Sequence, residues 1–231
     1  MRLDKLLANK AFGSRKEVHQ IIRDGRVTVN DAVILKKDQS IDIDDIIAVD
    51  GVQISTKQQY YIKFHKPAGY ITAVEDPTHP VVMDLLPPEF KKMGVFPVGR
   101  LDKDTEGLLL LTNDGIWAHS IINGHKHVPK VYDVEFNGKL TKEGIERIET
   151  GIVLGDGTQC KPAHIDVLSD RSLHITIEEG KYHQVKRMIG AAGGEVTYLK
   201  RLSIGHITLD GIEAINTYSE IDDQDVVDFK K

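Results

Sequence analysis

One short segment of the chain combines a lone carboxylate, a cation and glycines in a way that favours chemistry. Residues 98–115 read Val-Gly-Arg-Leu-Asp-Lys-Asp-Thr-Glu-Gly-Leu-Leu-Leu-Leu-Thr-Asn-Asp-Gly. The run from Leu108 to Leu111 is wholly apolar and is closed by a turn signal, which predicts a strand buried on both faces. Asp102 is therefore expected at the edge of a core, where an ionised carboxylate needs a cation or hydrogen bonds. Arg100, two residues away, is one candidate partner.

Two interpretations without catalysis compete at this loop. Asp102, Asp104, Glu106 and Gly107 match the first half of a calcium-binding loop, but Glu106 replaces the usual Asp or Asn. Asn113 stands where such a loop needs a bidentate carboxylate, and an apolar strand follows where a helix is required. The pattern therefore disfavours calcium. An ordinary surface loop stays open until the rest of the chain is considered.

Three further segments carry residue types that could meet Asp102; they are His65–Tyr70, Pro129–Asp133 and Glu178–Met188. In the last of these, helical spacing follows a glycine that ends a predicted strand. Lys186 and Arg187 then lie in the first turns of a predicted helix, where side chain and positive helix end both favour an anion. That anion is Asp102 or a phosphate, and the pattern alone leaves both open.

The composition is that of an ordinary globular protein, since 231 residues with 40% hydrophobic content suffice for a large core. The single cysteine, Cys160, excludes a disulfide framework or a cysteine-rich zinc site and indicates a reducing compartment. No apolar run reaches 18 residues, and the charged N-terminus does not fit a signal peptide. We therefore expect a cytoplasmic protein with no membrane association.

The net charge of −5 conceals a segregation of charge along the chain. Residues 1–37 carry nine Lys and Arg against four Asp and Glu, whereas the compensating acids lie in residues 38–50 and 220–228. A basic N-terminal face favours an anionic partner in spite of the negative total. The acidic tail predicts a solvated, partly ordered end.

Residues 1–57 are predicted to form a small domain of two helices and short strands. Leu3, Leu6 and Leu7 have helical spacing, and Ser14 with Glu17 forms a capping box at the start of a second helix. Gly25 suits the left-handed position after that helix. Short strands are expected at 26–29, 33–35 and 46–49.

Cations on the polar sides of these helices suit either solvent or an anionic partner. The segments Arg2–Ala8, Ser14–Glu17, Ile21–Asn30 and Asp45–Gly51 resemble the S4 RNA-binding domain, which has a small α-L fold. The resemblance implies binding of structured RNA through phosphate contacts and shape. The implied contacts are Arg2, Lys5, Arg15, Lys16, Arg23 and Arg26. Lys36 and Lys37 lie outside the clearest motif.

Residues 58–231 are predicted to form a second, larger domain after the polar link 53–60. Strands are expected at 60–64, 108–111, 131–136, 163–168, 173–178 and 207–209, and helices at 116–122, 142–150 and 182–192. Because strands outnumber helices and short turns join neighbours, we expect an α+β fold with a mixed, mainly antiparallel sheet.

The motifs of this domain are Gly99–Asp102, Thr105, Gly107–Thr112, Lys130–Tyr132 and Glu179–Met188. Together with the N-terminal motifs they resemble the pseudouridine synthases that carry an N-terminal S4 domain. The resemblance runs from Arg2 to about Leu209. His65–Tyr70 and Asp76–Pro80 are most similar to the branch of that family that acts on the small ribosomal subunit.

The resemblance implies isomerisation of a uridine within an RNA chain, in which the N1–C1′ bond breaks and C5 becomes bonded to C1′. Asp102 is implied as the nucleophile, attacking C1′ or the uracil ring. Tyr132 is implied to stack on the flipped-out base, and Lys186 to keep Asp102 ionised. Many relatives have arginine at the Lys186 position, so Arg187 stays open as the alternative partner. Arg100, Lys130 and Arg187 are expected RNA contacts.

The implied reaction has no redox step and no external group, so no cofactor and no metal is expected. His119, His125 and His127 fall within nine residues but have no regular spacing, and His183 is expected to be structural. The expected partner is small-subunit (16S) ribosomal RNA or a small-subunit assembly intermediate, bound by a monomer. Large-subunit RNA as the target, and a non-catalytic RNA-binding or ribosome-assembly protein with this fold, stay open as alternatives.

Overall fold

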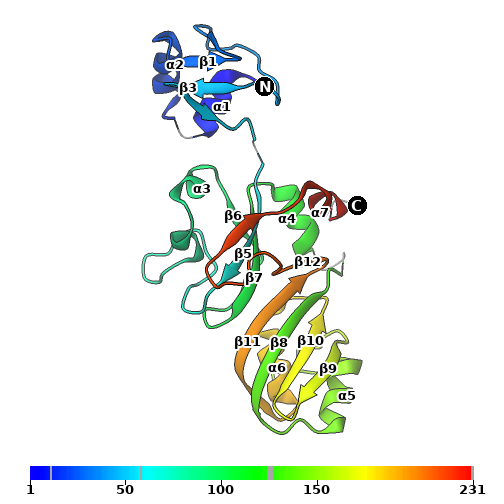
Figure 1. The fold of residues 1–231 in the computed structure, drawn as a ribbon. Coiled ribbons are helices and arrows are strands. Elements are labelled where there is room, and N and C mark those ends of the chain that lie inside the picture. Colours follow the sequence, from blue (N-terminus) through cyan, green and yellow to red (C-terminus); the bar gives the residue numbers. More distant parts are fainter. Residues whose placement is uncertain (11, 58, 124–126, 230–231) are drawn as a thin grey trace.

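The computed structural model describes residues 1–10, 12–57, 59–123 and 127–229, which form two units joined by a short link (Figure 1). The N-terminal unit contains helices α1 (Leu3–Asn9) and α2 (Arg15–Arg23) and a four-stranded sheet in the order β2-β1-β3-β4. Its strands are β1 (Val27–Val29), β2 (Ala32–Val33), β3 (Ile47–Val49) and β4 (Val52–Ile54). Both predicted helices are confirmed. The strand expected at 33–35 is instead the two-residue β2, because Ala32 and Val33 are the residues that pair with β1.

The N-terminal unit has a hydrophobic core of its own, to which both helices and the strands contribute. Helix α2 begins at the predicted capping box, where the Ser14 amide donates to Glu17 Oε2 at 2.7 Å and the Glu17 amide donates to Ser14 Oγ at 3.4 Å. These bonds satisfy two amide groups at the helix start. A division of the chain at 57/58 remains our proposal, and Gln58 itself lies outside the described residues.

The second unit is built on a nine-stranded sheet in which β7 and β11 are the parallel pair and the other pairings are antiparallel. The main path is β13 (Tyr218–Glu220), β5 (Tyr61–Lys66), β7 (Glu106–Thr112), β11 (Gly194–Ile204), β8 (Lys130–Gly138), β10 (Ser172–Ile177) and β9 (His164–Ser169). Strand β6 (Phe96–Val98) pairs with β7, and β12 (Ile207–Thr208) pairs with β11. The predicted mixed, mainly antiparallel sheet is confirmed.

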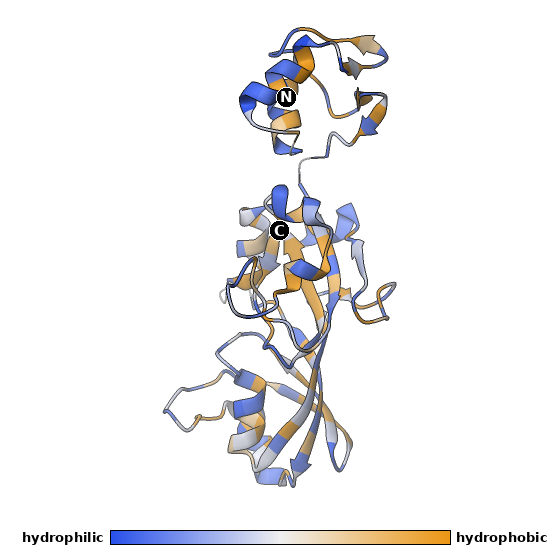
Figure 2. Cartoon of the chain, turned by 90° about the vertical axis from the view of Figure 1, so that its left-hand side faces the viewer, coloured by the Kyte–Doolittle hydropathy of each residue, from blue (hydrophilic) through white to orange (hydrophobic). Residues whose placement is uncertain are grey.

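Strand β7 lies between two hydrophobic clusters, as its four consecutive leucines predict. Leu108 and Leu110 pack in the cluster that contains Trp117, whereas Leu109 and Leu111 pack in the cluster on the other face of the sheet. All four side chains are fully buried. Figure 2 shows hydrophobic residues concentrated along these central strands. The loop before β7, which carries Asp102, is therefore fixed to the most buried strand of the domain.

Helices cover the sheet and complete the domain. Helices α4 (Gly115–Ile122) and α5 (Lys142–Thr150) match the prediction, and α6 (Gln184–Ala191) begins two residues later than expected because His183 is left-handed, with φ of +47°. Three elements have no counterpart among those predicted from the sequence: the 3₁₀ helix η1 (Val82–Leu85), helix α3 (Pro88–Lys92) and the long strand β11. Within the described part of the chain, no helix has the length and apolar character needed to span a membrane.

The acidic tail is more ordered than predicted, although most of its acidic side chains are exposed, as expected. Glu220 is the last residue of β13, which pairs with β5, and the residues that follow form helix α7 (Asp223–Asp228). Ile221, Val226 and Phe229 are buried in the cluster around Trp117, and the Trp117 indole N–H donates to the Val226 carbonyl at 3.2 Å. Three apolar side chains among the acids therefore order this segment against α4 (Figure 1).

Gly107 permits the close approach of β7 to β11. Its φ is +106°, and a Cβ at this position would lie 2.2 Å from the Arg201 carbonyl oxygen. Gly107→Ala is therefore expected to lower the free energy of unfolding by at least about 3 kcal/mol, through backbone strain and overlap. Urea unfolding measures the change.

Gly115→Ala is the matched control for this substitution. Gly115 begins α4 and a Cβ there meets nothing within 4 Å, so its effect is expected to stay below about 1 kcal/mol. Equal unfolding midpoints for the two variants would show that the close approach of β7 to β11 at Gly107 is not needed for stability.

Candidate active site

The backbone of the Asp102 loop is held by a buried lysine, Lys66, at the end of β5. Its ammonium group donates to the carbonyl oxygens of Pro67 at 2.9 Å, Asp102 at 3.1 Å and Thr105 at 2.7 Å. The side chain is fully buried, and this burial lowers the pKa of Lys66 to about 8, although nearby carboxylates oppose the shift. Lys66 was not singled out from the sequence, because the loop carbonyls of Asp102 and Thr105 that it contacts are distant along the chain.

A second set of hydrogen bonds fixes the loop from the side of residues 69–72. Thr72 Oγ1 donates to the Leu101 carbonyl at 2.8 Å and accepts from the Leu101 amide at 3.0 Å. The Gly69 amide donates to the Lys103 carbonyl at 2.7 Å. The segment before η1 thus sets the position of the residues on both sides of Asp102.

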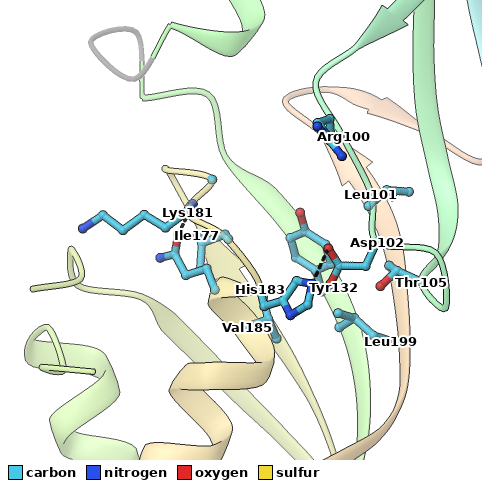
Figure 3. A pocket seen from close by; sticks show the side chains of 12 residues that line it. Arg100, Leu101, Asp102, Thr105, Tyr132, Ile177, Lys181, His183, Val185 and Leu199 are labelled. Carbon is cyan, nitrogen blue, oxygen red and sulfur yellow. Dashed lines mark hydrogen bonds and ion pairs between the residues drawn. The ribbon is translucent and has the colours of Figure 1, made fainter. Parts of the chain in front are cut away.

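The Asp102 carboxylate pairs with two groups from α6 and its N-terminal cap. Lys186 Nζ lies 3.1 Å from Oδ2, and His183 Nε2 lies 3.5 Å from Oδ1. Figure 3 shows the Asp102 and His183 side chains pointing toward each other, with the Tyr132 ring beside them. The Asp102 side chain keeps 27% of its surface exposed, so one face of the carboxylate can meet a ligand.

Lys186 is held in its charged form by two carboxylates. It also lies 2.5 Å from Asp104 Oδ1, and although burial opposes the shift, the hydrogen bonds to Asp104 and Asp102 raise the pKa of Lys186. Arg187 points elsewhere and pairs with Asp156 at 2.6 Å. Of the two cations left open by the sequence, the structure therefore places Lys186, and not Arg187, on Asp102.

Tyr132 lies on β8 beside a buried arginine from the neighbouring strand. Arg201 Nη1 donates to the Tyr132 hydroxyl at 3.4 Å, and Arg201 Nε donates to the Leu108 carbonyl at 2.7 Å. Arg201 pairs in register with Tyr132 on one side and with Gly107 on the other. This arginine therefore connects the strand that follows the Asp102 loop to the strand that carries Tyr132.

Arg201 went unnoticed in the sequence because the strand that carries it was not predicted. The only signal was its place in the run Tyr198–Ile204, in which apolar residues flank two adjacent cations. Arg201 is only 3% exposed, whereas Lys and Arg are usually exposed. Residue type alone therefore predicts that Arg201 lies on the surface.

A pocket of about 670 Å³ opens beside Asp102 and brings several of the predicted site residues together. Its lining includes Arg100, Asp102, Lys130, Tyr132, Tyr182 and Arg201. Lys130 donates to the Val128 carbonyl at 2.9 Å, and burial lowers its pKa to about 8. Arg100 is exposed at the margin of the pocket. An ionised carboxylate, an aromatic ring and a cationic margin suit an anionic polymer that carries a flat base.

The six predicted RNA contacts of the N-terminal unit are all exposed, but the structure divides them. Lys16 and Arg23 line a groove of about 610 Å³ together with Lys36 and Lys37, the two lysines outside the S4 motif. Arg2 pairs with Asp4 at 2.6 Å, and Arg26 pairs with Asp50 at 2.5 Å. Lys5 and Arg15 are exposed on the two helices and do not line this groove.

No group of three or more His, Cys, Asp or Glu side chains is placed to hold a metal ion within residues 1–10, 12–57, 59–123 and 127–229. His125, one of the three histidines weighed as metal ligands, lies outside these residues. His127 approaches Glu178 at 3.2 Å. His183, expected to be structural, instead lines the pocket and contacts Asp102.

Comparison with known proteins agrees with this arrangement of fold and site. The chain belongs to the RNA pseudouridylate synthase family, whose model matches residues 60–191, and an S4 domain model matches residues 1–47. It is 42% identical to the uncharacterized RNA pseudouridine synthase YtzG of Bacillus subtilis, over 98% of this chain and 97% of that one. It is 35% identical to ribosomal small subunit pseudouridine synthase A of Escherichia coli K12, over 98% of each.

A solved structure gives the same result for the fold. The crystal structure of a pseudouridylate synthase aligns with a TM-score of 0.68 at 30% identity and covers 99% of both chains. An S4 domain followed by a pseudouridine synthase domain, as expected from the motifs, is therefore confirmed. The chain is a pseudouridine synthase.

Proposed function

We propose that this protein isomerises one uridine of small-subunit (16S) ribosomal RNA to pseudouridine, with Asp102 as the nucleophile on a flipped-out base. The observation that carries the proposal is the 3.1 Å ion pair between Lys186 and Asp102 at the pocket that Tyr132 lines. A protonated lysine at this distance stabilises negative charge on the carboxylate, which a nucleophile requires. The small-subunit target is supported by the similarity to pseudouridine synthase A of Escherichia coli.

The reaction would begin when a uridine leaves its stack and enters the pocket, which costs a few kcal/mol that RNA contacts must offset. Asp102 attacks C1′ or the uracil ring, and the N1–C1′ bond breaks. The uracil then turns, and the bond to Asp102 breaks as C5 bonds to C1′, which restores the free carboxylate. The proton on C5 is lost while N1 gains one, so atoms balance without a further reactant. Tyr132 supplies a ring against the base and a hydroxyl near the moving proton.

The RNA is proposed to contact both units of the protein. The cations Arg100 and Lys130 would meet the backbone near the reacting uridine, because both line the pocket. Lys16 and Arg23 would meet a more distant part of the RNA through the groove on the N-terminal unit. We further propose a monomer that acts in the cytoplasm, on ribosomal RNA or on an assembly intermediate of the small subunit.

The target is tested by mapping pseudouridines in ribosomal RNA from cells with and without the gene. Loss of one small-subunit site, restored by the gene, is the expected result. Loss of a large-subunit site would replace the 16S target with a large-subunit one and leave the chemistry intact. An unchanged map would favour an RNA-binding protein that has kept the fold without the reaction.

Lys130 gives the reaction an expected dependence on pH. Because burial lowers the pKa of Lys130 to about 8, the side chain is charged below that pH and becomes neutral above it. If Lys130 holds an RNA phosphate, the KM for RNA should rise as the pH increases from 7 to 9. The measurement is KM against pH for the unsubstituted protein and for Lys130→Arg, which stays charged throughout. The same rise in both proteins would exclude Lys130 as its source.

A further inference from the structure

Tyr182 presents a large aromatic ring to solvent at the edge of the active-site pocket. It lies in the turn between β10 and α6, and its residue surface is 76% exposed. The pocket that contains Asp102 includes Tyr182 in its lining. A tyrosine ring left in water beside a binding site has apolar area that a ligand can cover.

The ring is held in place on one face. Tyr182 stacks on His183 with ring centroids 3.9 Å apart and an angle of 17° between the planes. His183 is itself fixed, since its left-handed backbone begins α6 and its Nε2 lies 3.5 Å from Asp102 Oδ1. A side chain of Arg187 donates to the Tyr182 carbonyl at 3.3 Å and pairs with Asp156. One face of the Tyr182 ring is therefore covered by His183, and the stack lies directly adjacent to Asp102.

Tyr132, the other tyrosine of the pocket, has too little exposed surface to stack on a base outside the pocket. It is 7% exposed, and Arg201 lies against its hydroxyl on the inner side. The pocket thus has two tyrosines in different states, one buried beside Asp102 and one exposed at the margin. A single-stranded RNA segment that places one base inside leaves its neighbour at the margin, where aromatic side chains commonly stack on bases.

We propose that the exposed face of Tyr182 is a stacking platform for the nucleobase next to the uridine that enters the Asp102 pocket. The inference rests on the proposed function, because it takes the uridine in that pocket as given. Stacking on an aromatic ring accepts any base, so Tyr182 would raise affinity for unpaired RNA at the target rather than read its sequence. The order of contacts would be neighbouring base, Tyr182, His183 and Asp102.

The first test uses tryptophan fluorescence, because the only tryptophan, Trp117, is fully buried and gives a constant background. Tyr182→Trp is titrated with a short oligouridylate and with an abasic ribose-phosphate oligomer of equal length, each to saturation judged by anisotropy of labelled oligomer. Quenching by the oligouridylate but not by the abasic oligomer is expected. Equal quenching by both, or none, would overturn the platform.

Tyr218→Trp is the matched control. Tyr218 is an exposed tyrosine on β13 and does not line the pocket. Its substitution is expected to give the same signal with both oligomers. A base-dependent signal at Tyr218 as well would show that stacking is unspecific and would overturn the assignment to Tyr182.

The second test measures turnover on whichever ribosomal RNA transcript the unsubstituted protein modifies. Tyr182→Ala is expected to raise KM about tenfold or more with kcat unchanged, and Tyr182→Phe to restore KM. A KM for Tyr182→Ala within about twofold of the unsubstituted value, or a loss confined to kcat, would overturn the proposal. If the unsubstituted protein modifies neither ribosomal RNA, the proposed function fails, and the fluorescence titration still decides the stacking.

Discussion

Asp102→Asn is expected to abolish pseudouridine formation while leaving RNA affinity nearly unchanged. Asparagine keeps the size of the side chain and an oxygen that can accept from Lys186, but an amide is not a nucleophile that can form the covalent intermediate. The expected loss is at least about 10⁴-fold in the single-turnover rate, the size seen when a catalytic nucleophile is removed. The rate is measured by pseudouridine formation in a ribosomal RNA transcript, and affinity by filter binding.

Asp104→Asn is the matched control for this substitution. Asp104 lies in the same loop and also pairs with Lys186, but its side chain is 73% exposed. Because Asp102 remains with Lys186, the expected loss is about tenfold or less. A normal rate in Asp102→Asn would show that this carboxylate is not the nucleophile. A parallel loss of RNA affinity would point instead to a binding role.

Lys66→Met is expected to lower the free energy of unfolding by about 3–5 kcal/mol, the largest stability effect that we anticipate from a charged residue. Methionine fills similar space but leaves the buried carbonyls of Pro67, Asp102 and Thr105 without their donor. Because these carbonyls belong to the loop that positions the nucleophile, activity should fall as well. Urea unfolding and single-turnover rates measure the two effects.

The pH dependence of stability gives a second readout for Lys66. Burial lowers its pKa to about 8 in the folded state, whereas an unfolded lysine titrates near 10.4, about its model-peptide value. Burying the charged ammonium group lowers the free energy of unfolding by its full amount below pH 8. This cost decreases as the pH rises from 8 toward 10.4, because the folded protein then carries neutral Lys66. The unsubstituted protein should therefore gain stability across this window relative to Lys66→Met. A relative loss would contradict the shift.

Lys63→Met is the control for both measurements. Lys63 lies on the same strand, and its Nζ donates to the Asp210 carbonyl at 2.6 Å in an exposed position. Water replaces that donor when the side chain is changed, so the expected effect is below about 1 kcal/mol. If Lys63→Met and Lys66→Met are equally stable, the lysine at position 66 does not hold the loop.

Elements with strong local signals could be predicted from the sequence. The four leucines of β7 identify a doubly buried strand because no polar residue interrupts them. Ser14 and Glu17 locate the start of α2 because a capping box depends only on residues three positions apart. The motif around Asp102 likewise indicated a carboxylate that needs a cation, and Lys186 is that neighbour in the structure.

Features that depend on distant partners escaped prediction. Strand β11 carries Lys200 and Arg201 at its centre, and their charge hides a strand whose neighbours on both sides come from remote segments. The choice between Lys186 and Arg187 depends on the register of α6, which the left-handed His183 sets. Adjacent helical residues point about 100° apart, so one residue decides which cation meets Asp102.

The pairing of β5 with β13 has a consequence for the order in which the protein acquires its abilities. The strands of the N-terminal sheet pair within residues 27–54. In contrast, Ile62 of β5 can pair with Glu220 of β13 only after the ribosome has synthesised almost the whole chain. At translation rates of about 5–20 residues per second, the second sheet is completed roughly ten to thirty seconds after the first. If the N-terminal unit binds RNA as proposed, a nascent chain gains that ability before it can modify RNA.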